Sequence, residues 1–532
     1  MTNRKFSKIL LCCLAVCLTA GLYAQQADMM AQMRKVQTAM FAFNALYVDS
    51  VDNDLMTTKA IQAMVKELDP HSDYMTAEEV KEMNEPLQGT FDGIGISFNM
   101  MNDTLFVVEV IAGGPSEKVG LQAGDRILKV DGEPIAGVRM SNKEVMKRLK
   151  GPKGTRVTVS VKRRGTQGLT DFVIVRDKIP VYSIDAAYKV DRQTAYIKIS
   201  RFGATTMDEF RKAFAEMMPF KTLILDLQSN GGGYMQTAVE LADQFLDKGK
   251  CIVYSQGLHM EREDATATVK GAFEQGNLII LIDEYSASSS EIVTGAVQDW
   301  DRGLVVGRRS FGKGLVQRMY PLGDGSVIKL TVSRYYTPSG RCIQKPYDQG
   351  KEAYGKDLID RYNRGEFLSA DSIHFPDSLR YATLVKGRTV YGGGGIMPDV
   401  FVPLDTTRMT DLHRKLIQKG ILNRFVLNYV DTHRADLKAA YPTADDFRAR
   451  FQTDDALMEE LLAAARADKF SPTEQQLAAD QSVLRLQLKA YIARDLYTTA
   501  EFYKVMAPEN DALQEALRIL SDRKRCEKYG LR

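Results

Sequence analysis

An apolar run at residues 277–283, Asn-Leu-Ile-Ile-Leu-Ile-Asp, constrains the fold of this chain more than any other segment. A continuous apolar run of this length between polar residues is typical of a strand buried on both faces of a parallel sheet. A helical pattern follows at residues 291–300. The serines from Ser288 to Ser290 are therefore predicted to lie at the turn between a buried strand and the start of a helix.

Strand and helix patterns alternate over a longer stretch that begins at about Val181. Strands are expected at residues 195–200 and 222–227, and helices at about 207–217 and 234–246. This alternation indicates a mixed α/β domain. The glycines of residues 231–233 follow one apolar strand as the serines follow another, so both turns are expected to face one cleft.

The serine turn and residues 311–317 together hold the groups for nucleophilic catalysis without a histidine. Ser288 is the candidate nucleophile, Lys313 the candidate base and Gln317 the candidate orienting amide. A lysine can act as a base only if burial lowers its pKa, and the glycines beside Lys313 allow the backbone to approach a cleft closely. The helix start would supply free amides for an oxyanion.

Two other interpretations use the same segments differently. Ser288 and Glu291 fit a capping box, in which the serine only satisfies amides at the helix start, and taken alone this interpretation is favoured. Residues 307–313 approach a phosphate-binding loop, but Gly314 stands where that loop needs a magnesium-binding serine or threonine. Nucleotide binding is therefore set aside.

A series of ordered motifs resembles the carboxy-terminal processing peptidases, also called tail-specific proteases, of the S41 serine peptidase family. The resemblance extends from about Leu68 to Val402. Its motifs occupy residues 68–72, 93–96, 225–233, 286–291, 311–317, 334–341 and 394–399. It implies a mixed α/β, crotonase-like catalytic core that requires neither a metal nor an organic cofactor.

The resemblance also implies a role for each candidate residue. Ser288 would be the nucleophile, Lys313 the general base and Gln317 the group that orients the lysine. The oxyanion hole would be formed by the amides of Gly232 and Ser289.

The chain departs from the family pattern at two positions in this site. Gly231 replaces the proline of the usual Asn-Pro-Gly-Gly, which makes the loop more flexible and predicts that substrate is needed to order it. Ser289 stands where alanine is common, but its backbone amide is unchanged.

Residues 89–164 are predicted to form a small β-rich domain that resembles a PDZ domain. A strand-like run at 106–111, the hairpin signal Asp131-Gly132 and the alternating valines at 157, 159 and 161 indicate short antiparallel strands. Residues 141–144 predict a capped helix.

In a PDZ domain, a glycine-containing loop binds the terminal carboxylate of a peptide through its amides, and the adjacent strand adds the peptide to the sheet. This resemblance assigns carboxylate binding to Gly93, Ile94, Gly95 and Ile96. The alternative is that these glycines only form a tight turn.

Residues 1–24 have the features of an export signal. Basic side chains precede an apolar segment that is too short to span a bilayer. This segment is followed by small residues near Ala24, as at a signal cleavage site. A lipoprotein signal before Cys17 is the weaker alternative. Removal of the signal takes away three basic and no acidic side chains, so the formal net charge of +3 falls to zero and nucleic acid is not an expected partner. The expected location is the periplasm or the bacterial envelope.

The remaining cysteines and the histidines give no sign of a metal site. Cys251, Cys342 and Cys526 are too few and too scattered for a disulfide framework, although one pair could form outside the cytoplasm. The five histidines show no metal-ligand spacing. His71 alone lies in a family motif and is expected to pack or hydrogen-bond in the Pro70 turn.

Helical patterns flank the two domains. An apolar stripe on one predicted helix is interpreted as a core face or a homodimer face, and comprises Met29, Met33, Val36, Met40, Phe43 and Tyr47. The C-terminal helices are expected either to pack on the protease or to form a dimer face.

The predicted multidomain α/β organisation is a signal at 1–24, a helical region at 25–88, a PDZ-like domain at 89–177, a catalytic domain at 178–404 and a helical region at 405–532. Residues 345–388 are an insertion, without an assigned role, between two family motifs.

The expected function is that of an exported serine endopeptidase. It would bind proteins with free, apolar C-termini through the PDZ-like domain and cleave near those termini. The alternative is a PDZ scaffold that holds tails without cutting them, against which the joint presence of Ser288, Lys313 and Gln317 argues. A third class, a hydrolase with a histidine base, requires a histidine beside Ser288.

Overall fold

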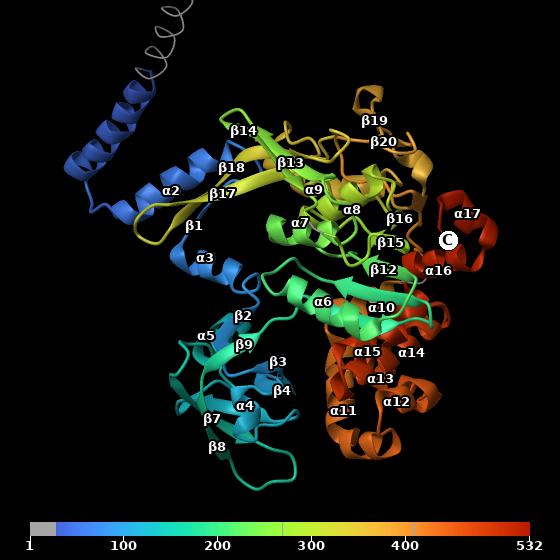
Figure 1. The fold of residues 1–532 in the computed structure, drawn as a ribbon. Coiled ribbons are helices and arrows are strands. Elements are labelled where there is room, and N and C mark those ends of the chain that lie inside the picture. Colours follow the sequence, from blue (N-terminus) through green and yellow to red (C-terminus); the bar gives the residue numbers. More distant parts are fainter. Residues whose placement is uncertain (1–27, 269, 408–409, 532) are drawn as a thin grey trace, which may run out of the picture. The chain divides into compact units, whose positions relative to one another are not determined.

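The structure, a computed structural model, describes residues 28–268, 270–407 and 410–531 (Figure 1). The predicted export signal lies outside these residues. The chain divides into two compact units, residues 1–68 and 69–532. Within the described ranges, no helix combines the length and the apolar character that a membrane span needs.

The first unit contains a helix over residues 28–46 and helix α2 (Asn53–Lys66). The side-chain amides of Asn44 and Asn53 donate hydrogen bonds to each other's oxygens, at 2.6 and 2.8 Å. Five of the six side chains in the predicted apolar stripe are exposed, and only Met40 is partly covered. The described part of the chain therefore does not bury this stripe in a core.

The predicted PDZ-like domain is an antiparallel sheet with strand order β3-β4-β5-β7-β8, in which β6 pairs with β5. Its strands are β3 (Ile96–Met101), β4 (Thr104–Val110), β5 (Arg126–Val130), β6 (Glu133–Pro134), β7 (Arg156–Lys162) and β8 (Thr170–Val175), with helices α4 (Pro115–Lys118) and α5 (Asn142–Leu149) and a separate ribbon of β2 (Thr90–Gly93) and β9 (Asp177–Pro180). The hairpin between β5 and β6 turns at Asp131 and Gly132, whose φ angles of 50° and 83° are both positive. Two positive φ angles are what a tight hairpin turn requires, which explains the Asp-Gly pair.

The catalytic region is built on a sheet with strand order β10-β11-β12-β15-β16-β21. The strands are β10 (Ile184–Lys189), β11 (Thr194–Ile199), β12 (Thr222–Asp226), β15 (Asn277–Ile282), β16 (Leu304–Gly307) and β21 (Val400–Phe401). Only the first pair is antiparallel. Every residue of β15 is buried, as the apolar run at 277–283 predicts. The mixed α/β core is therefore confirmed.

Helices cover both faces of this sheet. One face packs against α6 (Thr206–Met217), α7 (Met235–Asp243) and α8 (Ser289–Asp299). The other face, with Ile224 and Ile279, packs against α16 (Asp511–Ser521) near the end of the chain. Of the two arrangements expected for the C-terminal helices, the structure thus shows packing on the catalytic sheet.

A second sheet lies in the same unit. It pairs β1 (Asp73–Met75), β18 (Val327–Tyr336), β13 (Cys251–Gly257) and β14 (Met260–Thr266) in that order, and β17 (Leu315–Pro321) also pairs with β18. Strand β1 falls inside the region that was predicted to be helical. Three residues are too few to produce a strand periodicity in the sequence, so this part of the prediction is wrong.

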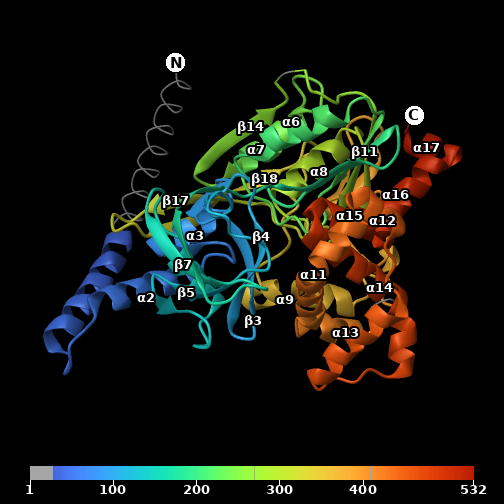
Figure 2. The same cartoon turned by 90° about the horizontal axis from the view of Figure 1, so that it is seen from below.

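The C-terminal region also forms a separate helical cluster (Figure 2). It contains α10 (Asp411–Gln418), α11 (Ile421–Ala440), α12 (Ala444–Arg450), α13 (Asp455–Ala467) and α14 (Glu474–Leu496). Helices α15 (Thr499–Met506), α16 and α17 (Arg523–Tyr529) follow. Arg126 of the PDZ-like domain forms a 2.9 Å ion pair with Asp431 of α11.

The insertion at 345–388 contributes helix α9 (Gly350–Asn363) and strand β19 (Arg380–Ala382), and β19 pairs with β20 (Thr389–Tyr391). Helix α3 (Ala77–Asn84) lies between β1 and β2 in the sequence. The cysteines Cys251, Cys342 and Cys526 are free thiols.

Candidate active site

The glycine loop and the serine turn follow two neighbouring strands. Strands β12 and β15 are parallel, and their carboxyl ends lead into residues 231–233 and Ser288. A Cβ atom placed on Gly232 would lie 2.8 Å from Ser288 Cβ and 3.1 Å from the Ser289 nitrogen. Only glycine fits at position 232, because the glycine loop and the serine turn approach each other so closely there. The two turns therefore meet, as the sequence predicts.

Ser288 has an unusual backbone conformation. Its φ of 57° and ψ of −112° place it immediately before helix α8, with the Glu291 amide donating to its carbonyl oxygen at 2.8 Å. A residue other than glycine in such a region costs about 1–3 kcal/mol and persists only where its surroundings hold it. The Ser289 amide donates no hydrogen bond within the described residues and remains free for a ligand.

The Glu291 carboxylate holds Ser288 and Lys313 in place. One oxygen accepts from the amides of Ser288, at 2.8 Å, and Lys313, at 2.9 Å. The other accepts from the Gly312 amide, at 2.7 Å, and the Ser310 hydroxyl, at 2.6 Å. Burial raises the pKa of Glu291 to about 7, although all four donors favour the ionised form. The acidic member of the predicted capping box thus spans two segments.

A second buried group joins the same two segments. The Tyr335 hydroxyl lies 3.0 Å from the Ser288 carbonyl oxygen and 2.7 Å from that of Lys313, and its single hydrogen is shared between these two acceptors. Tyr335 is only 1% exposed and comes from β18. The backbones of the predicted nucleophile and base are therefore fixed to one another at their amides and at their carbonyls.

The Lys313 side chain is partly buried. Burial, and then the charge of Lys329, lower the pKa of Lys313, whereas Glu291 and Asp69 act in the opposite direction. No hydrogen bond joins Lys313 Nζ to Ser288 Oγ in the part of the chain that the structure describes. The two predicted catalytic residues share a scaffold, but their reacting atoms are not bonded in this arrangement.

Gln317 lies on β17 and is not bonded to Lys313. Its amide nitrogen donates to the Thr331 hydroxyl at 3.2 Å, and this hydroxyl donates to Asp69 at 3.0 Å. Asp69 also accepts from the amides of His71 and Ser72. The prediction singled out Gln317 but missed Thr331 and Asp69 as its neighbours, because only the pairing of β18 with both β17 and β1 brings these segments together.

The Gly232 amide is already occupied. It donates to the side-chain oxygen of Asn230 at 2.9 Å, and the amide nitrogen of Asn230 donates to the Ile199 carbonyl oxygen at 2.9 Å. Use of Gly232 as an oxyanion donor therefore requires its amide to turn away from Asn230. A Cβ atom at Gly231 would meet nothing within 4 Å, so the glycine that replaces the family proline is not imposed by crowding.

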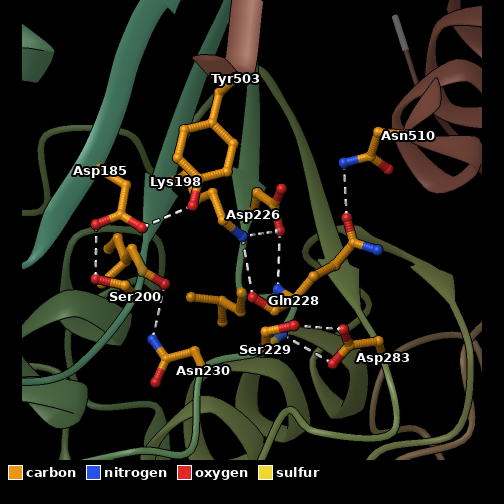
Figure 3. A network of polar contacts seen from close by, with 12 residues as sticks. Asp185, Lys198, Ser200, Asp226, Gln228, Ser229, Asn230, Asp283, Tyr503 and Asn510 are labelled. Carbon is orange, nitrogen blue, oxygen red and sulfur yellow. Dashed lines mark hydrogen bonds and ion pairs between the residues drawn. The ribbon is translucent and has the colours of Figure 1, made fainter. Parts of the chain in front are cut away.

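Contacts from several elements hold the start of this loop (Figure 3). Ser229 donates to Asp283 through its amide at 2.9 Å and its hydroxyl at 3.1 Å. Asn510 donates to the side chain of Gln228 at 2.9 Å, and Lys198 donates to the Gln228 carbonyl oxygen at 3.0 Å. These contacts fix Gln228 and Ser229, which precede the three glycines, and the need for substrate to order the glycines stays a prediction.

None of the described histidines is hydrogen-bonded to Ser288. His71 contacts the Tyr354 hydroxyl through Nε2 at 2.8 Å, and His413 contacts Gln487. His433 contacts the Tyr429 carbonyl oxygen. The third class considered above, a hydrolase with a histidine base, thus finds no support in these contacts.

The predicted carboxylate-binding loop joins β2 to β3. Gly95 has a φ of +77°, and a Cβ atom there would lie 3.0 Å from Ile179 Cδ1. The amides of Ile94 and Gly95 donate no hydrogen bond among the described residues, while the carbonyl oxygen of Ile94 accepts from Ser116. Strand β3 is at the end of the sheet order, so its outer edge is unpaired in this sheet.

Comparisons with known families agree with this arrangement. Residues 193–350 match peptidase family S41, and residues 93–172 match the PDZ domain. Residues 19–79 match the N-terminal domain of the activating protease CtpB, and residues 412–498 match a family of unknown function.

Individual relatives are similar over more than half of the chain. A carboxy-terminal-processing protease of Bartonella bacilliformis is 37% identical over 307 residues, which cover 56% of this chain and 69% of that protein. A CtpA-like serine protease of Staphylococcus aureus strain N315 is 36% identical over 318 residues, which cover 59% of this chain and 63% of that protein. The chain thus spans less than two thirds of the staphylococcal relative. Among solved structures, the PDZ domain of a carboxy-terminal protease from Vibrio cholerae in complex with peptide is 34% identical, covers 17% of this chain and 97% of that chain, and gives a TM-score of 0.16.

The fold and these matches define a serine-type peptidase that carries a PDZ domain. More narrowly, the chain belongs to the carboxy-terminal processing proteases of peptidase family S41. This confirms the family that the sequence motifs resemble.

The role of Glu291 can be tested with Glu291→Gln, which keeps the shape of the side chain. One carboxylate oxygen becomes an NH₂ group, which cannot accept the hydrogen bonds that this oxygen accepts. The segments of Ser288 and Lys313 are then expected to separate, and a displacement of about 1 Å between reacting groups costs about 100-fold in rate. Peptidase assays on the variant and on the exposed control Glu261→Gln measure this loss. Equal activity of both variants, with circular dichroism confirming their folding, would contradict the assigned role.

Proposed function

We propose that this protein is an exported serine endopeptidase that binds the free C-terminus of a protein through its PDZ domain and cleaves near that terminus with a Ser288–Lys313 dyad. The observation that carries the proposal is the buried Glu291 carboxylate, which accepts hydrogen bonds from the amides of both Ser288 and Lys313. A hydroxyl nucleophile and a lysine of lowered pKa on one rigid scaffold are the components that such a dyad needs.

In this mechanism, neutral Lys313 takes the proton of Ser288 as the serine oxygen attacks the scissile carbonyl. The amides of Ser289 and Gly232 stabilise the oxyanion, each by about 3 kcal/mol. Lys313 then protonates the leaving amine, and the same base activates the water that hydrolyses the acyl-enzyme. Gln317 orients the lysine once Thr331 releases its amide.

Three movements are required before catalysis, and the release of the Gln317 amide from Thr331 is one of them. Lys313 Nζ must come within hydrogen-bonding reach of Ser288 Oγ, and the Gly232 amide must leave Asn230. Lys313 is a base only when neutral, so activity is present above its pKa and lost below it. Because burial and then Lys329 lower this pKa, the active range extends to lower pH than for an ordinary lysine.

The catalytic assignment is tested with Ser288→Ala and Lys313→Ala, incubated with unstructured substrates that bear apolar tails. Each variant is expected to lose at least about 10³-fold in kcat, because the members of a catalytic unit act together. Ser521→Ala and Lys351→Ala, at exposed positions, are the matched controls. Undiminished cleavage by Ser288→Ala or Lys313→Ala would overturn the dyad.

For tail recognition, the proposal is supported by the free amides of Ile94 and Gly95 and by the unpaired edge of β3. Amidation of the substrate's C-terminus removes the charge that these amides would bind. Since hydrogen bonds to charged groups contribute about 1.5–3 kcal/mol, an amidated tail peptide is expected to bind about 10- to 100-fold more weakly. Fluorescence anisotropy with Ser288→Ala protein measures this difference without cleavage.

A glycine variant provides a second readout for tail binding. Gly95→Ala is expected to weaken binding, and Gly165→Ala is its control, because Gly165 has a φ of +79° but nothing within 4 Å of an added Cβ. The two variants share the backbone strain, and only the Cβ atom at position 95 also meets a neighbour, Ile179 Cδ1 at 3.0 Å. Equal affinity of the free and amidated peptides would contradict carboxylate capture, and tail binding without any cleavage would favour the scaffold alternative.

Export and self-association complete the proposal. The signal features of residues 1–24 support export to the periplasm or envelope, and N-terminal sequencing of protein from whole cells would detect a retained signal. The exposed apolar stripe on residues 29–47 supports a homodimer. Sedimentation of the full chain measures this directly, and a monomer at all concentrations would exclude it.

A further inference from the structure

Helix α9, the first element of the insertion, buries two of its side chains. Tyr354 is 7% exposed and Arg361 is 1% exposed. The two are seven residues apart, which is close to two helical turns, so they lie on the same face of the helix. This face contacts two segments next to the proposed base.

Arg361 binds the main chain immediately before the lysine loop. Its guanidinium donates to the carbonyl oxygens of Arg309, at 2.7 Å, and Ser310, at 3.1 Å. Glu366 lies 3.4 Å from its Nε and balances the buried charge. A planar guanidinium that donates to two successive carbonyls fixes the path of the chain between them. The next residues along this path lead directly to Lys313.

Tyr354 contacts the Asp69–Ser72 turn as well as the lysine loop. Its hydroxyl lies 2.8 Å from His71 Nε2, in the turn whose Asp69 binds Thr331. Its ring makes edge contacts with Phe311 and with the His71 ring, at centroid distances of 6.0 and 5.2 Å. One helix face thus contacts the Phe311–Gly314 loop and the Asp69–Ser72 turn.

Lys345 fastens the helix to this loop. Its ammonium lies 4.0 Å from the centre of the Phe311 ring and 4.1 Å from that of Tyr354. It also pairs with Asp357 at 2.9 Å, one turn beyond Tyr354. Its backbone amide donates to the Gly312 carbonyl oxygen at 2.9 Å. The loop is therefore held both by main-chain bonds and by α9.

We propose that α9 holds the Phe311–Gly314 loop and the Asp69–Ser72 turn together and so keeps the Lys313 amine enclosed, with Tyr354 and Arg361 as positioning residues. The proposal rests on the proposed function in taking Lys313 as the base. It gives the insertion a role in setting the protonation of that base.

The charges around Lys313 determine what loosening this contact would do. The titratable groups that act on it or are acted on by it are Asp69, His71, Glu291 and Lys329. Burial, and then the Lys313 charge, lower the pKa of His71 to about 4, so His71 is neutral at pH 7. Movement of the Asp69–Ser72 turn away from Lys313 would weaken the effect of the Asp69 charge, which raises the pKa of Lys313, but it would also admit water, which stabilises the ammonium form. Burial is the largest cause of the shift and Asp69 the smallest, so the loss of burial decides the direction. The pKa of Lys313 would then rise toward its ordinary value.

The test measures the protonation of Lys313 directly, without using catalysis. Full-length protein in the Ser288→Ala background is labelled with acetic anhydride across a pH range, and mass spectrometry follows the modification of Lys313. Tyr354→Phe removes one hydroxyl and keeps the ring. It is expected to raise the labelling midpoint of Lys313 by about half a pH unit or more.

The matched control is Tyr362→Phe, on the exposed side of the same helix. It is expected to leave the midpoint unchanged. A second variant, Arg361→Lys, keeps the charge beside Glu366 but cannot bridge both carbonyls, and is expected to shift the midpoint in the same direction as Tyr354→Phe. If Arg361→Lys does not fold, the comparison of Tyr354→Phe with Tyr362→Phe decides alone.

A peptidase assay on the same α9 variants, made in protein that retains Ser288, separates this proposal from the proposed function. A raised midpoint in Tyr354→Phe supports the role of α9 even if the parent protein cleaves nothing. Where the parent cleaves, kcat is expected to fall at pH 7 while KM is unchanged. Equal Lys313 midpoints in Tyr354→Phe, Tyr362→Phe and the parent would overturn the proposal, whatever the activity.

Discussion

The arrangement of the active site depends on one buried carboxylate. Glu291 accepts four hydrogen bonds, and its donors come from the serine turn and from the loop that carries Lys313. Without these bonds, buried amides on both segments would lack acceptors, which is costly in a protein interior. The strained backbone of Ser288 and the path of the lysine loop therefore have a common support, and Tyr335 reinforces it from the second sheet.

Much of this architecture follows from the sequence because local patterns carry it. The apolar run of β15, the helix after it and the hairpin at Asp131 each depend on neighbours within a few residues. The meeting of the 231–233 loop with Ser288 also follows, since neighbouring parallel strands end at the same edge of a sheet.

Other features lie beyond such patterns because distant segments create them. In the sequence, the spacing of Glu291 to Ser288 predicts only a helix-capping role. The contacts of its oxygens with the amides of Gly312 and Lys313 form only in the folded chain. The Asn230 bond to the Gly232 amide and the Thr331 bond to Gln317 likewise depend on tertiary contacts. These are the bonds that decide whether the proposed oxyanion donor and orienting amide are free.

The position of α16 has a consequence for the order in which the protein is completed. Its apolar residues cover the face of the catalytic sheet that includes Ile224 and Ile279, and they lie far downstream of Ser288 in the chain. During synthesis from the N-terminus, that face stays open to water until α16 has been made. A nascent chain that contains the serine and the lysine but not yet α16 therefore lacks the finished core beneath its catalytic sheet.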